Sequence, residues 1–247
     1  MEGRNIRLLI AYDGSDFCGW QRQESERTVQ GEIENALEKM HGSSVNLTGC
    51  GRTDSGVHAV GQTANFFSTL DSIPACRFAP ALNSLLPQDV RVLEASEESP
   101  DFHARFSAKA RVYRYQFICL RRALPHEGRY HLYLNRFPNI ELLNAYGRLI
   151  LGETDCSIFT ASGDTSKSRH RYIYRACFYV EAERLVFEIC ANAFLRNMVR
   201  SVAGTFLHYE EALTPPEKLA EIIASGQRAL AGPTLPPQGL FLWRVEY

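Results

Sequence analysis

The sequence predicts an α+β fold with a mostly antiparallel sheet and helices packed on it. Strand-like segments occur in adjacent pairs, and single helices separate these pairs in both halves of the chain. Hydrophobic residues make up 45% of the 247 residues, which is enough for a well-filled core. No low-complexity linker interrupts the chain. We therefore expect two α/β halves, residues 1–104 and 105–247, around a shared sheet.

The first half begins with an alternating segment, residues 6–12, that predicts a strand. A helix is expected over residues 29–40, because Val29, Ile33 and Leu37 fall on one face at helical spacing. Thr28 stands before this helix as a plausible N-cap. The other elements expected here are strands over 45–50 and 60–67 and a helix near Pro80, where proline is tolerated only close to a helix start.

The second half begins with a strand over residues 111–120. A helix is predicted over 191–207, and we expect Phe194, Met198, Val202 and Phe206 to form its buried stripe. The other elements expected here are a helix capped by Asn139, a hairpin of 172–180 and 184–190, a final strand over 239–247, and a helix within 214–226 with Thr214 as N-cap, Pro215 at N1, Glu217 closing a capping box and Gly226 at its end.

Charge is unevenly distributed, although the formal net charge is only −1. Residues 101–136 hold eight Lys/Arg against two acids, and residues 165–175 hold four Lys/Arg and no acid. Acids gather in 24–38, 89–101 and 210–221. These basic runs are either ordinary solvated surface or a face that attracts a polyanion.

The cysteines and the first residues indicate the compartment. Seven cysteines without paired spacing are typical of reduced thiols in a cytosolic protein. The start, MEGRNIRLLIAYDG, lacks a signal-peptide profile. The sequence also has no run of about 18 apolar residues, which a membrane span would require. We therefore expect a cytoplasmic protein that does not enter a membrane.

The segment CGRTDSGVHAVGQ, residues 50–62, permits three interpretations. Asp54 could form a tight turn with Ser55 and Gly56. A metal could bind Cys50, Asp54 and His58, although this spacing is not a strong zinc pattern. Alternatively, Asp54 is a carboxylate prepared for chemistry, since the glycines let a ligand approach and the Arg52 cation favours its ionised form.

Two other segments could serve either packing or chemistry. In RVYRYQF, Tyr113 and Tyr115 are either core residues or a base-stacking platform beside the cations of Arg105, Lys109 and Arg111. In the predicted helix over 191–207, Arg196 and Arg200 lie at i, i+4 spacing. They either extend to water or pair with a carboxylate or phosphate. No P-loop or dinucleotide fingerprint accompanies these segments.

Five segments together resemble the successive motifs of the TruA-type tRNA pseudouridine synthases and span nearly the whole chain. They are YDGSDFCGWQRQ, GCGRTDSGVHAVGQ, DFHARFSAKARVYRY, NAFLRNMVRSVAGTFL and GLFLW. The resemblance implies the pseudouridine synthase fold, with a central active-site cleft. It also implies cofactor-free and metal-free isomerisation of uridine to pseudouridine at tRNA positions 38, 39 and 40, in the anticodon stem-loop.

The resemblance also implies roles for individual residues. Asp54 becomes the essential catalytic residue, and Arg200 pairs with it. Tyr113 stacks on the uracil and is a candidate base for proton removal, while Leu240 lines the pocket. Arg52 displaces the target base and holds the RNA. Arg105 and Arg111 are expected to bind substrate as part of the basic surface that follows the tRNA backbone.

Two segments depart from the family pattern. SKSRHRYIY, residues 166–174, replaces or shifts a threonine-arginine-isoleucine run, so no role is carried over to it. Pro80 interrupts a segment that is normally plainer helix. The resemblance further implies a homodimer in which a tRNA contacts both subunits. The competing classes are a non-catalytic RNA-binding protein on the same scaffold, a synthase with another RNA target, and a metal-dependent hydrolase.

Overall fold

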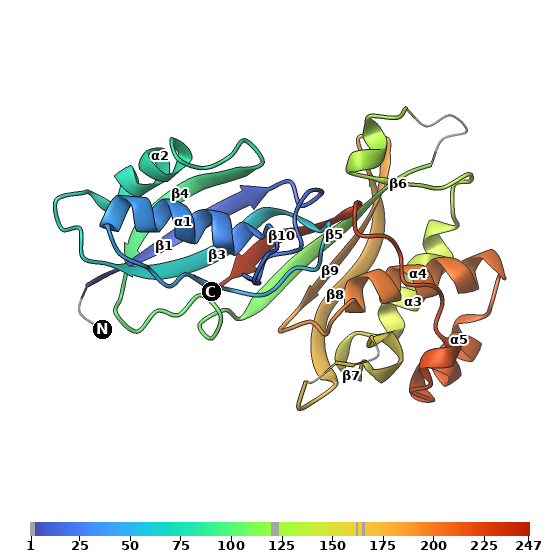
Figure 1. Cartoon of the computed structure of the whole chain (residues 1–247). Helices are drawn as coiled ribbons and strands as arrows, with labels where there is room; N and C mark the ends of the chain where they lie inside the picture. Colours follow the sequence, from blue (N-terminus) through green and yellow to red (C-terminus); the bar gives the residue numbers. More distant parts are fainter. Residues whose placement is uncertain (1–2, 120–123, 162, 165) are drawn as a thin grey trace. The chain divides into compact units, whose positions relative to one another are not determined.

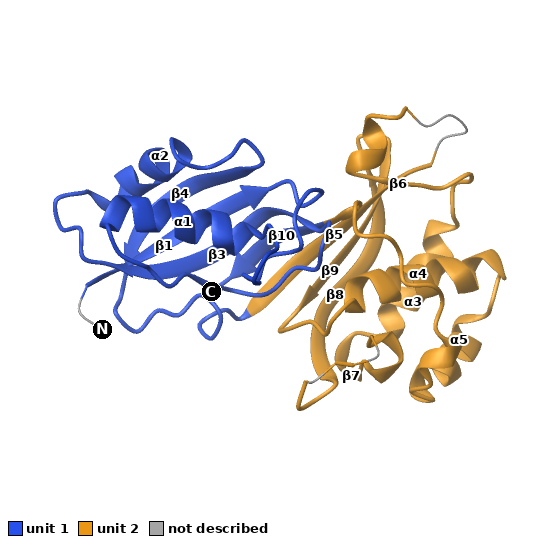
Figure 2. Ribbon diagram, in the orientation of Figure 1, with its two compact units in different colours: residues 1–109, 241–247 blue, residues 110–240 orange. Residues whose placement is uncertain are grey.

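The computed structural model describes residues 3–119, 124–161, 163–164 and 166–247 (Figure 1). The chain divides into two compact units, which Figure 2 colours separately. Unit 1 comprises Met1–Lys109 and Phe241–Tyr247, and unit 2 comprises Ala110–Leu240. The division therefore falls after Lys109 rather than at residue 104, and the end of the chain returns to unit 1. Because most strand pairs are antiparallel and helices accompany both units, the predicted α+β class is confirmed.

The strands of unit 1 follow the order β4-β1-β3-β10. β1 pairs antiparallel with both β3 and β4, whereas β10 runs parallel to β3, with Phe241 opposite His58. The strands expected near both ends of the chain are confirmed, but only a short piece of the one expected over 45–50 forms. The strand bounds are Arg4–Tyr12 (β1), Thr48–Gly49 (β2), His58–Ser68 (β3), Val90–Glu98 (β4) and Leu240–Glu246 (β10).

The main helix of unit 1, α1 (Val29–His41), is confirmed together with its N-cap. The Thr28 hydroxyl accepts a hydrogen bond from the Gly31 amide, and Gly42 ends the helix in the left-handed conformation. A one-turn 3₁₀ helix, η1 (Ala75–Arg77), leads into α2 (Phe78–Asn83). Pro80 lies in the first turn of α2, where its missing amide proton costs nothing, so the expected helix is also confirmed.

The strands of unit 2 follow the order β5-β9-β8-β7, and each neighbouring pair is antiparallel. The predicted hairpin is confirmed: β8 turns into β9 through Ala182 and Glu183, whose φ angles are 47° and 66°. Two positive φ angles match the right-handed twist of the flanking strands. The bounds are Ala110–Ile118 (β5), Leu132–Tyr133 (β6, parallel to β5), Gly152–Asp155 (β7), His170–Glu181 (β8) and Arg184–Ala191 (β9).

The helices of unit 2 correct two predictions. α4 is Met198–Glu211 and does not begin at residue 191, because Ala191 still belongs to β9 and Asn197 has a φ of 61°. Phe194 therefore precedes the helix, while Met198, Val202 and Phe206 form the buried stripe as predicted. Arg196 and Arg200 consequently do not share a helix face.

The second correction concerns α5, Pro216–Ala224. Its N-cap is Pro215, which has no side-chain acceptor, so the predicted cap at Thr214 is wrong. In α3, Ile140–Leu149, the expected cap is confirmed, since the Asn139 side chain accepts from the Leu142 amide. The short 3₁₀ helices of unit 2 are η2 (Glu127–Arg129), η3 (Ser157–Phe159) and η4 (Arg228–Leu230).

Stacked aromatic rings form the core of unit 2. Phe178 lies on Phe187 with ring centroids 4.6 Å apart, and Phe206 of α4 meets Phe187 edge-on at 6.2 Å. Burial of each such side chain contributes about 1.5–3 kcal/mol. These contacts fix α4, and with it the first turn that carries Arg200, against β8 and β9. Within the described residues, no helix is long and apolar enough to cross a membrane.

Candidate active site

Arg52 and Asp54 lie on one loop of unit 1, residues 50–57, between β2 and β3. The loop closes with a turn in which the Val57 amide donates to the Asp54 main-chain carbonyl at 3.2 Å. Gly56 has a φ of 76°, as the third residue of a type II turn requires. The predicted turn is therefore real, and the main-chain carbonyl of Asp54 accepts the hydrogen bond that closes it. Asp54 is half-buried and Arg52 is exposed.

A second loop, residues 13–22, holds the Asp54 loop in place. The Trp20 amide donates to the Thr53 carbonyl at 3.1 Å, and the Phe17 carbonyl accepts from both the Gly56 amide and the Ser55 hydroxyl. Tyr12, at the end of β1, bonds the Thr53 hydroxyl at 2.8 Å. The residues on either side of Asp54 are thus tied to a neighbouring segment by hydrogen bonds.

Two glycines allow these loops to approach so closely. A Cβ on Gly14 would lie 2.0 Å from the Val57 carbonyl oxygen, and one on Gly19 would lie 2.6 Å from that of Thr53. Gly19 also has a φ of 87°, which strains any other residue. In contrast, a Cβ on Gly51 would meet nothing within 4 Å. Gly14 and Gly19 therefore serve backbone packing, and Gly51 faces open space.

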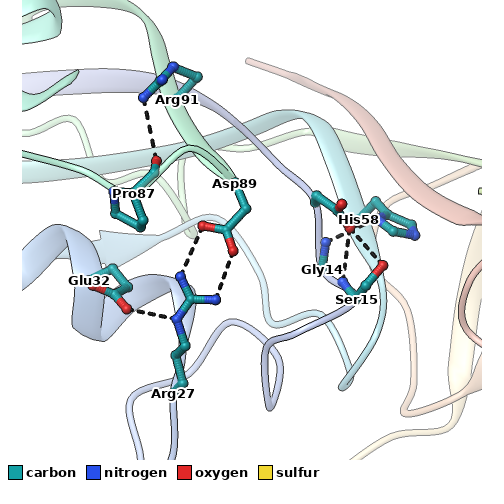
Figure 3. A network of polar contacts seen from close by, with 9 residues as sticks. Gly14, Ser15, Arg27, Glu32, His58, Pro87, Asp89 and Arg91 are labelled. Atoms are coloured by element: carbon teal, nitrogen blue, oxygen red, sulfur yellow. Dashed lines mark hydrogen bonds and ion pairs between the residues drawn. The ribbon is translucent and has the colours of Figure 1, made fainter. Parts of the chain in front are cut away.

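Figure 3 shows the ion pairs of Arg27 and, next to them, the polar contacts of Gly14 and Ser15 at the start of the 13–22 loop. The Arg27 guanidinium donates to both carboxylate oxygens of Asp89, at 2.7 and 3.0 Å, and to Glu32. It also lies over the Phe17 ring, 4.1 Å from the centroid. A paired, stacked arginine of this kind fixes Phe17, whose carbonyl in turn fixes the Asp54 loop.

His58 and Cys50 have structural partners. The Gly14 amide donates to His58 Nδ1 at 2.9 Å, and the ring stacks on Phe241 at 4.7 Å. The Asp13 carboxylate lies 3.2 Å from the same ring nitrogen. The Cys50 thiol donates to Gln62 Oε1. Among the described residues, no group of three or more His, Cys, Asp and Glu could hold a metal ion.

Tyr113 lies on β5 in unit 2 and is almost fully buried. The Phe194 ring meets it edge-on, with centroids 4.9 Å apart. Phe194, which precedes α4, thus packs against Tyr113 rather than in the buried stripe of the helix. Packing in the core and stacking on a base are therefore compatible roles for Tyr113, because the contact with Phe194 holds its ring in one orientation.

Arg200 lies in the first turn of α4 and contacts the segment that leads into β10. Its Nε donates to the Leu235 carbonyl at 2.6 Å, and its Nη1 donates to Asn197 Oδ1 at 3.0 Å. This segment can approach α4 closely because Gly204 has no side chain. A Cβ there would lie 1.8 Å from the Pro233 carbonyl oxygen. Two hydrogen bonds thus limit the directions in which the guanidinium can point.

Tyr115 belongs to the same cluster in unit 2. Its hydroxyl donates to the Pro236 carbonyl at 2.6 Å, and the side chain is fully buried. Burial raises the pKa of this phenol well above its ordinary value, against the opposing effect of the Arg200 cation. Tyr115 is therefore a neutral hydrogen-bond donor that holds the 235–240 segment.

The remaining candidates occupy different places. Leu240 is buried, and its amide donates to the Pro237 carbonyl. Arg111 of β5 donates to the Asn192 carbonyl in unit 2. Arg105 belongs to unit 1 and lies 5.7 Å from the ring centroid of Phe106, which is 76% exposed. Unit 1 thus provides Arg52, Asp54 and Arg105, and unit 2 provides Tyr113, Arg111, Arg200 and Leu240.

The basic run over 101–136 is less free to attract a polyanion than the sequence implies. Arg114 bonds Glu188 at 2.7 Å, and Arg136 pairs with the buried carboxylate of Glu210. Both pairs join segments far apart in sequence, so the charge count along the chain could not reveal them. Two further cations of this run, Arg121 and Arg122, lie outside the described residues.

Sequence reasoning missed several residues that support the site. Gln21 accepts from Arg52, Gln62 holds the Gly51 carbonyl, and Phe194 covers Tyr113. The sequence held one signal of such support, because Gln30 and Glu34 are polar residues four apart beside the apolar stripe of α1. In the structure both side chains are buried.

Comparison with known proteins identifies the family. A family model described as tRNA pseudouridine synthase matches residues 8–107 and 148–247. The chain is 51% identical over 249 residues to a tRNA pseudouridine synthase A of Treponema denticola, covering 99% of this chain and 93% of that protein. It is 48% identical to its namesake in Treponema pallidum (93% and 84% covered) and 42% identical to that of Caldicellulosiruptor saccharolyticus (99% and 100% covered). The chain belongs to the tRNA pseudouridine synthase family.

Proposed function

We propose that the protein isomerises uridine to pseudouridine at positions 38, 39 and 40 in the anticodon stem-loop of tRNAs, with Asp54 as the essential catalytic carboxylate. The observation that carries the proposal is the Asp54 loop, whose two sides are bonded to the 13–22 loop. The family resemblance and the relatives named tRNA pseudouridine synthase A support the reaction.

The reaction is an isomerisation that needs no oxidant or co-substrate. The bond from ribose C1′ to uracil N1 breaks, the detached uracil turns, and a bond from C1′ to C5 forms. The proton on C5 leaves, and N1 gains one, so atoms and electrons balance. What the protein must supply is an anion near C1′, a surface that retains the detached base, and a group that accepts the C5 proton.

Each proposed residue meets one of these needs. Asp54 provides the anion, and Arg200 pairs with it, keeping it ionised and oriented. The Tyr113 ring, supported by Phe194, stacks on the uracil, and its hydroxyl is the candidate for proton removal. Leu240 supplies an aliphatic wall that retains the uracil without fixing its rotation.

Access to the uridine requires that the nucleotide leave its stack, at a cost of about a few kcal/mol. We assign Arg52 to this step, because it is exposed and two residues from Asp54. Its guanidinium takes the space of the displaced base and meets phosphate. Arg105 and Arg111 contribute cations that meet the RNA backbone.

We further infer a cytoplasmic homodimer in which each tRNA contacts both subunits. This inference rests on the family resemblance. Without tRNA, light scattering is expected to give twice the 27.9 kDa of one chain, and with tRNA the mass of the bound RNA is added to that of two chains. A monomer at micromolar concentration that still modifies tRNA would contradict it.

The test of the function compares the wild type with Asp54→Asn on unmodified tRNA transcripts, with pseudouridine mapped at nucleotide resolution. The wild type is expected to modify positions 38–40, and Asp54→Asn is expected to modify none. Asp101→Asn, an exposed aspartate of the same unit, is the matched control and should keep full activity. A wild type that binds tRNA without producing pseudouridine would show that the protein is a binding module.

A further inference from the structure

Arg52 is the exposed end of a chain of hydrogen bonds that reaches into unit 1. Its Nε donates to Gln21 Oε1 at 3.1 Å, and Gln21 Nε2 donates to Gln30 Oε1 at 2.7 Å. Gln30 Nε2 then donates to Glu34 Oε1 at 3.0 Å. The exposed arginine is thus connected through two side-chain amides to a buried carboxylate on α1.

The buried carboxylate fixes the direction of every bond in this chain. An ionised carboxylate only accepts, so Gln30 must present its NH₂ group to Glu34. The carbonyl oxygen of Gln30 then points the other way, where it accepts from Gln21 Nε2 and from the Arg22 amide. Gln21 must therefore turn its own carbonyl oxygen outward, to the position where it accepts from Arg52.

The inner end of the chain is held firmly. Glu34 Oε1 also accepts from the Leu47 amide, and Glu34 Oε2 accepts from the Arg22 guanidinium at 3.0 Å. Gln30 Nε2 makes a second bond, to the Leu47 carbonyl at 2.9 Å. Because the buried amide and carboxylate are bonded on both sides, neither can turn without leaving a buried polar atom unpaired.

We infer that Gln21 is a positioning residue for Arg52: it holds the guanidinium in the direction needed to displace the target base, and Gln30 and Glu34 set its orientation. The inference rests on the proposed function. An arginine side chain loses rotamer entropy when it becomes ordered. The outward carbonyl of Gln21 orders the Arg52 side chain before the RNA binds, so less of this entropy is lost during the reaction.

The test is a double-mutant cycle on kcat/KM for tRNA modification. Gln21→Met keeps the length of the side chain but removes its acceptor, and it is expected to lower kcat/KM about tenfold, as for loss of a hydrogen bond to a charged group. In an Arg52→Ala background the same substitution should change kcat/KM less than about twofold, because its partner is already absent. The matched control is Gln23→Met, two residues further along the chain, where the side-chain amide donates to the Cys18 carbonyl. This substitution should leave activity unchanged.

Two measurements guard against a merely structural effect. Thermal unfolding should give equal midpoints for Gln21→Met and Gln23→Met. Gln21→Asn, which keeps the amide but is one methylene too short to span both bonds, should reproduce the loss in activity.

Equal losses from Gln21→Met in the two backgrounds, or no loss in either, would overturn the positioning role while leaving the proposed function intact. A wild type that forms no pseudouridine would instead overturn the proposed function itself.

Discussion

Replacing Gly14 with alanine should damage the Asp54 loop from a distance. The new Cβ would lie 2.0 Å from the Val57 carbonyl oxygen, whereas ordinary van der Waals contact begins at 3.4 Å. Both partners are backbone, so a segment must shift by roughly 1 Å to relieve the clash. Gly14 also donates to His58, and Val57 closes the Asp54 turn, so the shift reaches both.

The expected cost in stability is about 3 kcal/mol, the upper end for overpacking, because no flexible side chain can yield. Activity should fall by about a hundredfold, since roughly 1 Å of misplacement is enough for such a loss. Urea unfolding and single-turnover pseudouridine formation, measured on the folded fraction, report the two effects separately.

Gly51→Ala is the matched control, because its Cβ would meet nothing within 4 Å. It should leave the free energy of unfolding unchanged or raise it by about 0.4–1 kcal/mol, since it restricts only the unfolded chain. If Gly14→Ala had the wild-type midpoint and turnover, the claim that the 13–22 loop positions Asp54 would be wrong.

Three further predictions concern unit 2. Tyr113→Phe should lower turnover far more than tRNA affinity, because the ring still packs on Phe194 while the hydroxyl is lost; equal turnover in stopped-time assays would remove its role in proton transfer. Arg200→Met should lower the free energy of unfolding by about 1–2 kcal/mol, because the Leu235 carbonyl loses its donor, and should nearly abolish activity; a fully active variant would contradict the role proposed for Arg200. Burial lowers the pKa of His131, so the unfolded chain binds more protons than the folded one, and stability should decrease as pH falls below about 6.5. His131→Phe should weaken this pH dependence of the free energy of unfolding, measured by urea titrations at several pH values. An unchanged dependence on pH would contradict the role of His131.

Much of the fold was predictable because local signals agreed with the final structure. Thr28 and Asn139 cap helices as their sequences predict, and the pattern of 6–12 forms β1. Strand β4 was not predicted, since five of its nine residues are exposed and its acids read as solvated surface. Thr214 failed as a cap because Pro215 and Pro216 moved the helix start by one residue.

The site was predictable to the extent that its residues lie in recognisable motifs. Arg52 and Asp54 could be proposed from their own segment, but their supports come from residues about 30 to 40 positions away, as with Trp20 and Thr53. Phe194 was assigned to a helix because its spacing fits one, yet its ring packs on Tyr113. Such contacts depend on tertiary structure, which periodicity in one segment does not encode.

Asp54 is the residue on which the proposed reaction depends most directly. The decisive measurement is pseudouridine at positions 38, 39 and 40 of tRNA from cells that carry the wild-type protein, Asp54→Asn, or neither. We expect modification only with the wild type, while purified Asp54→Asn still binds tRNA with nearly unchanged affinity. Pseudouridine formed at these positions by Asp54→Asn, at the wild-type rate, would contradict it.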